Sequence, residues 1–112
     1  MNNIKDDIYY ATKIRDDFRF IINNTKSLTK EQISKNEILI DSIMFRLIQI
    51  SENSLKLSES FKAKFNNIPW YAIKGLRNRI VHDYGNVDYT VVYDTIKNEI
   101  PHCIEELNKI IK

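Results

Sequence analysis

Apolar residues recur at spacings of three and four at the start of the chain, and this spacing constrains the fold more than any other feature. They are Ile4, Ile8, Ala11, Ile14, Phe18, Ile21 and Ile22, with charged residues between them. The pattern predicts an amphipathic helix over residues 4–22 that packs on another element and ends at Asn23-Asn24. No segment has the convincing alternation of a strand, and the chain has only two glycines and two prolines. An all-α fold is therefore expected.

The middle of the chain predicts a short helical turn, a long helix and a further short helix. Thr29 and Gln32 have the spacing of a capping box, which opens a turn that ends before Lys35-Asn36. The short helix is expected over residues 58–65. The long helix is expected over residues 37–57, and its apolar residues cover more than one face: Ile38, Ile40, Ile43, Met44, Leu47, Ile48, Ile50, Leu55 and Leu57. Such a helix needs two neighbours, the rest of its own bundle and, as one option, a second chain.

Two more helices are predicted in the last third of the chain. Pro69 stands at the first position of one of them, where a missing N–H costs nothing, and Gly85-Asn86 ends it. Asp88 caps the other, which is expected over residues 89–111, with a kink near residues 97–98 caused by Pro101. The expected architecture is an all-α, up-and-down bundle of four to five helices, formed by one domain over residues 1–112.

Composition excludes several classes of protein. Seventeen basic and fifteen acidic residues give a net charge of +2, which lacks the basic field of a sequence-independent nucleic-acid binder, so any attraction to RNA must be local. Cys103 is the only cysteine, which excludes a disulfide within the chain and a cysteine-based zinc site. We interpret Cys103 as a small buried apolar residue and His102 as a residue beside the kink. Neither a glycine-rich phosphate loop nor a cofactor is expected, and without a signal region or membrane span the cytoplasm is the expected location.

Most of the reactive side chains lie in one stretch of eight residues, Arg-Asn-Arg-Ile-Val-His-Asp-Tyr, from Arg77 to Tyr84. Arginine is a forked, permanently charged donor for phosphate, and histidine moves protons near neutral pH. Arg77 and His82 would suit cleavage of an RNA phosphodiester without a metal, with His82 handling a proton and Arg77 holding the phosphate. The alternative interpretation is that these residues form caps and salt bridges at a helix end.

A single straight helix does not bring these side chains together. At about 100° per residue, Arg77 and Tyr84 fall on nearly the same face, whereas His82 lies roughly 140° from Arg77. Either the helix frays before Gly85 and swings His82 round, or a second copy of the motif completes the site across a two-fold axis. The second option agrees with the two apolar faces of the 37–57 helix. It would also double the local positive charge, because Arg77 and Arg79 would be paired with their mates.

The stretch resembles the Arg-x4-His-x-Tyr motif of HepT-like HEPN proteins, the toxin half of a bacterial and archaeal toxin–antitoxin pair. Ser51 and Asn53 stand where that family often has Gly and Ala around Glu52, a difference that bears on dimer or partner packing. Glu52 is therefore either a solvated surface charge or, by its place in the family pattern, a carboxylate near the site. The likeness is strongest over residues 45–107 and includes four further segments: Arg46 to Asn53, Ile68-Pro69-Trp70, Val87-Asp88 and Glu99-Ile100-Pro101.

The resemblance implies a homodimer or higher oligomer that cleaves RNA, with tRNA as one candidate, independently of metals. Arg77 and His82 would be the catalytic pair, with Asn78 and Arg79 in support. Tyr84 would be the target of an MntA-like nucleotidyltransferase antitoxin that transfers AMP from ATP to the phenol. The added bulk and negative charge would block the RNA groove. The alternative is a non-catalytic helical partner that binds a nucleotidyltransferase.

Overall fold

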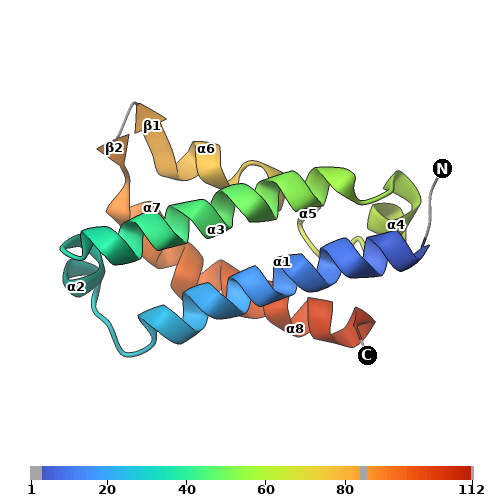
Figure 1. The fold of residues 1–112 in the computed structure, drawn as a ribbon, viewed down its shortest axis with the longest axis horizontal. Coiled ribbons are helices and arrows are strands. Elements are labelled where there is room, and N and C mark those ends of the chain that lie inside the picture. Colours follow the sequence, from blue (N-terminus) through green and yellow to red (C-terminus); the bar gives the residue numbers. More distant parts are fainter. Residues whose placement is uncertain (1–3, 84–85, 112) are drawn as a thin grey trace.

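The computed structural model describes residues 4–83 and 86–111, without the side chains of Ile4, His82 and Asp83. This part of the chain is almost entirely helical (Figure 1), which confirms the all-α prediction. In chain order the elements are α1 (Ile4–Thr25), α2 (Lys30–Ser34), α3 (Glu37–Lys56), α4 (Glu59–Lys64), α5 (Trp70–Lys74), α6 (Leu76–Ile80), β1 (Val81–Asp83), β2 (Asn86–Val87), α7 (Tyr89–Asp94), a π-helical segment (Thr95–Glu99) and α8 (Ile100–Ile110).

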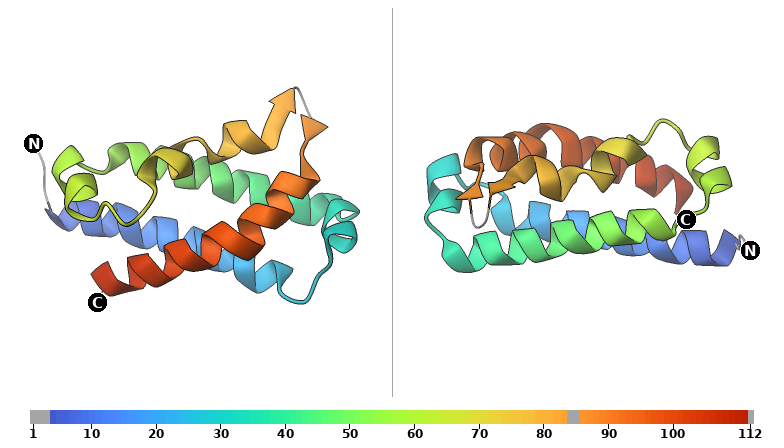
Figure 2. Two further views of the ribbon diagram at one scale, coloured as in Figure 1. Left: turned by 180° about the vertical axis from the view of Figure 1, so that it is seen from behind. Right: turned by 90° about the horizontal axis from the view of Figure 1, so that it is seen from above.

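The bundle consists of four helical segments that alternate in direction, as predicted. They are α1, α3, the pair α5–α6, and the continuous run from α7 through the π-helical segment to α8. Helix α1 packs between α3 and α8, while α5 and α6 lie against α3 (Figure 2). The short helices α2 and α4 lie in the connections. The start of α1 and the end of α8 lie at one end of the molecule, and α2 and the β1–β2 ribbon lie at the other.

An apolar core fills the space between the four segments. Helix α3 shows how it is built, because its inward residues Ile40, Ile43, Leu47 and Ile50 are buried at spacings of three and four. Burying each such side chain contributes about 1.5–3 kcal/mol. The other core residues come from every segment: Ala11, Ile14, Phe18, Ile21, Ile33, Leu57, Phe61, Ile68, Trp70, Ile73, Leu76, Ile80, Val92, Ile96, Ile100, Cys103 and Leu107.

Side-chain caps set several helix starts where the sequence predicted them. Thr29 and Gln32 form both hydrogen bonds of a capping box at the start of α2. Asp88 accepts a hydrogen bond of 3.1 Å from the backbone N–H of Val91 and so caps α7. At the start of α4, Ser58 accepts one from the backbone N–H of Phe61. Each cap satisfies a helix N–H that has no partner within the helix.

Helix α1 is longer than predicted, because it continues through Asn23-Asn24 to Thr25. Asn24 donates from its amide to the backbone oxygen of Phe20 at 2.8 Å, and the Thr25 hydroxyl donates to that of Ile21 at 2.7 Å. Both side chains thus bond to carbonyls of the last turn instead of turning the chain away. Bonds from a side chain back to the carbonyl four residues earlier are a pattern found for such residues inside helices.

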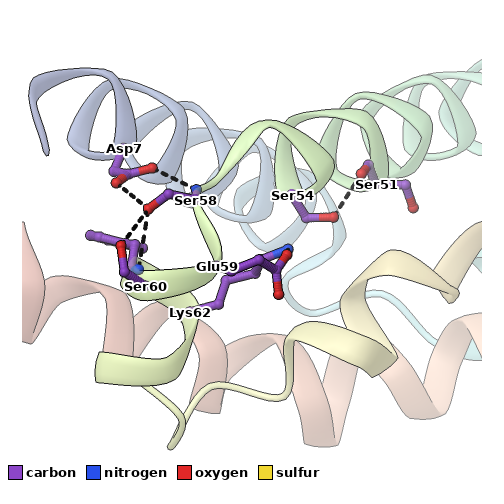
Figure 3. A network of polar contacts seen from close by, with 8 residues as sticks. Asp7, Ser51, Ser54, Ser58, Glu59, Ser60 and Lys62 are labelled. Carbon is purple, nitrogen blue, oxygen red and sulfur yellow. Dashed lines mark hydrogen bonds and ion pairs between the residues drawn. The ribbon is translucent and has the colours of Figure 1, made fainter. Parts of the chain in front are cut away.

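A buried carboxylate joins the start of α1 to the α3–α4 connection (Figure 3). Asp7 is 5% exposed and accepts two hydrogen bonds from Ser58, at 2.8 Å from the backbone N–H and 2.7 Å from the hydroxyl. Ser58 is itself the cap of α4, so one side chain holds three elements together. In the same view Ser54 donates to the backbone oxygen of Ser51 at 2.7 Å.

The predicted helix from Pro69 to Gly85 is wrong in two respects. It is interrupted at Gly75, which separates α5 from α6, and it ends at Ile80. The chain then turns into an antiparallel ribbon in which Val81 pairs with Val87 and Asp83 with Asn86, so the expectation of no strands is also wrong. The backbone oxygen of Ile80 accepts from the N–H of Asp88 at 2.8 Å. This hydrogen bond takes the place of the one that the Ile80 carbonyl would accept within a continuing helix. The β-branched side chain of Val81 also favours the extended conformation that follows.

Pro69 itself is the N-cap of α5 and not its first helical residue, a difference of one position that is common at helix ends. Near the second proline, where a kink was expected, the winding differs from that of an ordinary α-helix. Residues Thr95–Glu99 wind as a π-helix, and the N–H of Ile100 bonds to the backbone oxygen of Thr95, five residues earlier. Because Pro101 has no N–H for the carbonyl of Lys97, the ordinary winding cannot continue through this turn.

Candidate active site

The motif, residues 77–84, begins on α6, a five-residue helix that is too short to be stable without its neighbours. Leu76 and Ile80 anchor it in the core. Helix α3 supports the preceding turn through Ser51, whose hydroxyl lies 3.2 Å from the backbone oxygen of Ile73 and 3.0 Å from that of Lys74. The small Ser51 side chain thus lets the backbone at the end of α5 lie close to α3 within the same chain.

Arg77 extends into solvent from α6. Its Nη1 donates to the side-chain oxygen of Asn78 at 3.3 Å, and both side chains are exposed. No carboxylate of the described residues forms an ion pair with Arg77. Since its one recorded partner is a neutral amide, the guanidinium keeps its full charge and most of its donors. This is the state that an arginine needs to bind a phosphate, and it places Asn78 where it can orient the guanidinium.

Arg79 is engaged differently. Its Nη2 lies 2.9 Å from Oε1 of Glu99, and its Nη1 lies 3.3 Å from Oε2, so that the two side chains form a bidentate ion pair. Two residues along a helix correspond to about 200°, so Arg77 and Arg79 point to nearly opposite sides of α6. The structure therefore separates the two arginines of the motif.

His82 follows two residues after the end of α6, with its backbone in β1. The sequence left two possibilities: a helix that ends before Gly85, or a site completed by a second chain. The backbone agrees with the first possibility, because the helix ends at Ile80 and the chain changes direction ahead of His82. The side chain of His82 lies outside the described part of the structure, and so does Tyr84. The proximity of His82 to Arg77 and the role of Tyr84 remain predictions.

Glu52 lies on the outward face of α3, one residue after the serine that contacts α5. It is exposed and forms no ion pair with any described residue. Its exposure agrees with the interpretation as a solvated charge, and its neighbour Ser51 connects that face of α3 to the turn before α6. A role for Glu52 in the site stays a prediction.

Cys103 and His102 lie on α8, outside the motif. Burial and, to a smaller extent, the nearby charge of Glu99 together raise the pKa of the Cys103 thiol to about 11. The thiol is therefore neutral near pH 7, and the prediction of a small buried apolar residue is confirmed. His102 is exposed.

Within the described residues no three His, Cys, Asp or Glu side chains form a group that could hold a metal ion. None of the helices described here has the length and apolar character needed to cross a membrane.

The contact of Arg79 with Glu99 is the feature of this site that sequence reasoning missed. From the sequence, the segment Glu99-Ile100-Pro101 indicates only a resemblance to the family pattern. The two residues are 20 positions apart and lie on different helical segments. No helical spacing of three or four connects them, so only the fold reveals the pair.

Comparison with known proteins identifies the family of the chain. The family model described as Ribonuclease HepT-like matches residues 14–110. "Putative RNase MJ1216" and "Putative RNase MJ0125" of Methanocaldococcus jannaschii are each 34% identical to this chain over 110 residues. The aligned region is 98% of this chain in both cases, and 88% and 92% of the two relatives, respectively.

A further relative carries the family name itself. "Probable ribonuclease HepT" of Thermococcus cleftensis is 32% identical over 63 residues, which are 56% of this chain and 57% of that protein. No solved structure is a significant match. The family model covers most of the helical bundle, including α6 and the residues that follow it. The chain therefore belongs to the HepT-like ribonuclease family.

Proposed function

We propose that this protein is the toxin of a toxin–antitoxin pair, a metal-independent endoribonuclease that cleaves RNA through Arg77 and His82. The observation that carries the proposal is the state of Arg77. It is exposed, its recorded partner is the neutral amide of Asn78, and no described carboxylate offsets its charge. A solvent-facing guanidinium five residues before a histidine, in a member of a ribonuclease family, is suited to an RNA phosphate.

The proposed chemistry uses the ribose 2′-hydroxyl as the nucleophile. His82 takes the proton of this hydroxyl or delivers one to the leaving 5′-oxygen. The 2′-oxygen forms a bond to phosphorus while the bond from phosphorus to the 5′-oxygen breaks, which gives a 2′,3′-cyclic phosphate and a 5′-hydroxyl. Arg77 offsets the charge that builds up on the phosphoryl oxygens, and Asn78 orients its guanidinium. This chemistry restricts the substrate to RNA, with tRNA as one candidate.

A homodimer is part of the proposal, and the outward face of α3 supports it. Ile38, Phe45, Ile48 and Leu55 are 82%, 58%, 39% and 57% exposed. Their spacings of seven, three and seven residues are those of the apolar positions in a coiled-coil seam. An exposed apolar stripe of this kind is typical of a surface that another protein covers. Because Ser51 connects α3 to the turn before α6, a second copy on this stripe would lie beside the motif.

We propose that the ribonuclease activity is controlled by modification of Tyr84. A nucleotidyltransferase antitoxin of the MntA type would transfer AMP from ATP to the phenol, which adds bulk and negative charge to the motif that must bind RNA. The toxin itself would need no cofactor. RNA and ATP are both cytoplasmic, and we propose the cytoplasm as the site of action. Incubation with a nucleotidyltransferase of the MntA type and ATP should add the mass of AMP to a peptide containing Tyr84. The absence of added mass, or its persistence in Tyr84→Phe, would exclude this mechanism.

The nuclease activity is tested by expressing the wild type, Arg77→Ala and His82→Ala separately in bacteria. The wild type should arrest growth and cut RNA, and the purified protein should do so with EDTA present and leave 2′,3′-cyclic phosphate ends. Both variants should be harmless, while Lys26→Ala, which removes a charge from an exposed position outside the motif, should behave as the wild type. If none of the proteins cuts RNA, the enzyme proposal fails and a non-catalytic partner of the nucleotidyltransferase takes its place.

Mixed dimers test whether two chains build each site. If Arg77 and His82 act together across the dimer, co-expressed Arg77→Ala and His82→Ala chains form one intact site per mixed dimer, and activity returns. If both residues act within one chain, every site in the mixture lacks a catalytic group and the RNA stays whole. Phe45→Glu, placed on the α3 stripe, should give a monomer in light scattering. A Phe45→Glu protein that is still a dimer would show that the stripe is not the interface.

A further inference from the structure

Among the described side chains of the motif, Arg79 forms a contact with two hydrogen bonds, its ion pair with Glu99. Two hydrogen bonds of 2.9 and 3.3 Å join the planar guanidinium to the planar carboxylate. The partners are about 40% exposed and come from α6 and the π-helical segment. A bidentate arrangement fixes orientation as well as distance, which a single hydrogen bond does not.

We infer that Glu99 is a positioning residue for the motif. By holding Arg79, it sets the rotation of α6 about its axis and leaves Arg77 as the cation that meets the phosphate. This inference rests on the proposed function, because the phosphate is that of the RNA substrate. Arg79 is accordingly a structural partner of Glu99 and does not contact RNA.

The geometry of α6 explains why this contact matters for Arg77. The helix has five residues and only two of them, Leu76 and Ile80, are anchored in the core. Apolar contacts resist separation of α6 from the bundle but are not directional, so they resist its rotation less well. Since Arg79 lies about 200° from Arg77 around the helix, a rotation that breaks its bonds to Glu99 also moves the Arg77 guanidinium.

The π-helical segment determines where Glu99 points. The hydrogen bond from the N–H of Ile100 to the backbone oxygen of Thr95 spans five residues, one more than in an α-helix. The extra residue in this turn changes the direction of every side chain at its end relative to α7. Glu99 is the last residue of the segment and is the one that meets Arg79. π-helical turns occur often at functional sites, and this one supplies a partner for the motif.

The charges around Arg77 and Arg79 also indicate that Arg77 binds phosphate and that Arg79 has a structural role. The carboxylate of Glu99 offsets the charge of Arg79, whereas the partner of Arg77 among the described residues is the neutral Asn78 amide. A dimer would therefore present two uncompensated arginines from the two motifs, one from each chain, and not four. This revises the expectation that Arg77 and Arg79 would both be paired with their mates to double the local positive charge.

The inference is tested by measuring kcat and KM for variants of Arg79 and Glu99, including one in which the two residues are exchanged. Glu99→Gln and Arg79→Gln should each lower kcat roughly 10- to 100-fold, the size expected when a catalytic group is misplaced, while KM changes little. The double variant with Arg79→Glu and Glu99→Arg restores the pair with its charges exchanged, so it should recover most of kcat. As a matched control, Glu31→Gln removes the acidic partner of Lys35 in the exposed pair on α2 and should leave kcat unchanged.

The salt dependence of RNA binding separates positioning from phosphate contact. Measured in a His82→Ala background, where the RNA stays whole, Arg77→Gln should lower the slope of log K against log salt by about one. Arg79→Gln should leave the slope unchanged. The inference is overturned if Arg79→Gln lowers this slope as Arg77→Gln does, if the exchanged pair is no more active than Arg79→Glu alone, or if Glu99→Gln has the kcat of the wild type. A wild type that cleaves no RNA would instead defeat the proposed function, and this inference with it.

Discussion

The two ends of the bundle are held by different kinds of interaction. At the end where α1 begins and α8 finishes, carboxylates that are nearly buried accept hydrogen bonds from other segments, as Asp7 does from Ser58 and Glu106 from Asn67. At the other end α6 and the β1–β2 ribbon carry the motif, and the ion pair that its described residue Arg79 forms with Glu99 is about 40% exposed. Stability and proposed chemistry thus reside in different parts of the molecule. Variants should be able to impair either one alone.

The largest effect on stability is expected in the body of the bundle. Phe18 is fully buried in the middle of α1. Phe18→Ala removes most of an aromatic side chain and leaves a cavity, which should lower the free energy of unfolding by about 3–5 kcal/mol. Urea titration followed by circular dichroism measures this change. Tyr71→Ala, at a position that is 89% exposed, is the matched control and should stay within about 0.5 kcal/mol of the wild type. Equal losses in the two variants would contradict the assignment of the core.

The next largest effect is expected at the ion pair between α1 and α3. Asp17 is 4% exposed, its Oδ1 lies 2.8 Å from Nη1 of Arg46, and the Arg46 guanidinium stacks 3.8 Å from the centre of the Phe20 ring. Arg46→Met leaves a buried carboxylate without its partner. Because Arg46 is partly exposed, the cost should be about 2–3 kcal/mol, below the range for a fully buried pair.

A double-mutant cycle with Asp17→Asn measures this coupling directly. The double variant should be more stable than Arg46→Met alone, since the amide carries no charge that needs compensation. If the costs of the two single changes simply add, the two side chains do not depend on each other and the structural assignment of the pair is wrong.

The same contrast explains how far the sequence predicted the molecule. Local signals were sufficient for the bundle: the apolar spacing of α1 and α3, the capping box at Thr29 and the cap at Asp88 all appear in the structure. The motif end was predicted less well, because its shape depends on contacts between distant segments. The bond from Asp88 to Ile80 that ends α6, and the pairing of strands around the turn, have no signature in a helical pattern. The sequence was sufficient to recognise the motif. It did not show that Arg79 forms an ion pair with Glu99 whereas Arg77 extends into solvent.

A smaller, pH-dependent effect is expected from Glu106 at the end of the molecule opposite the motif. The hydrogen bond from Lys109, with a further one from Asn67, lowers the pKa of the Glu106 carboxyl below its usual 4.5. A carboxyl whose pKa is lower in the folded state stabilises the fold above its unfolded pKa, and loses that contribution as pH falls through the folded value.

Unfolding of the wild type and of Glu106→Gln should therefore differ near pH 7 and converge as the pH falls well below 4.5. Thermal unfolding monitored across this range measures the difference. Glu105→Gln, at the exposed neighbouring position, is the control and should run parallel to the wild type. A constant difference between the wild type and Glu106→Gln at all pH values would mean that Glu106 contributes through packing and not through its charge.

The smallest effect on stability is expected at Arg77, and it gives the sharpest test of the separation between the two ends. Arg77 is exposed and its recorded hydrogen bond is to its neighbour Asn78, so Arg77→Gln should change the free energy of unfolding by less than about 0.5 kcal/mol. If it stabilises the transition state of RNA cleavage, the same change should lower kcat on the order of 100- to 1,000-fold. Arg46→Met should do the reverse, losing stability while each folded molecule keeps its activity. Both properties can be measured on one preparation of each protein. An Arg77→Gln protein that loses activity only in proportion to its loss of folded protein would contradict the separation, because the motif would then act through the fold and not through the substrate.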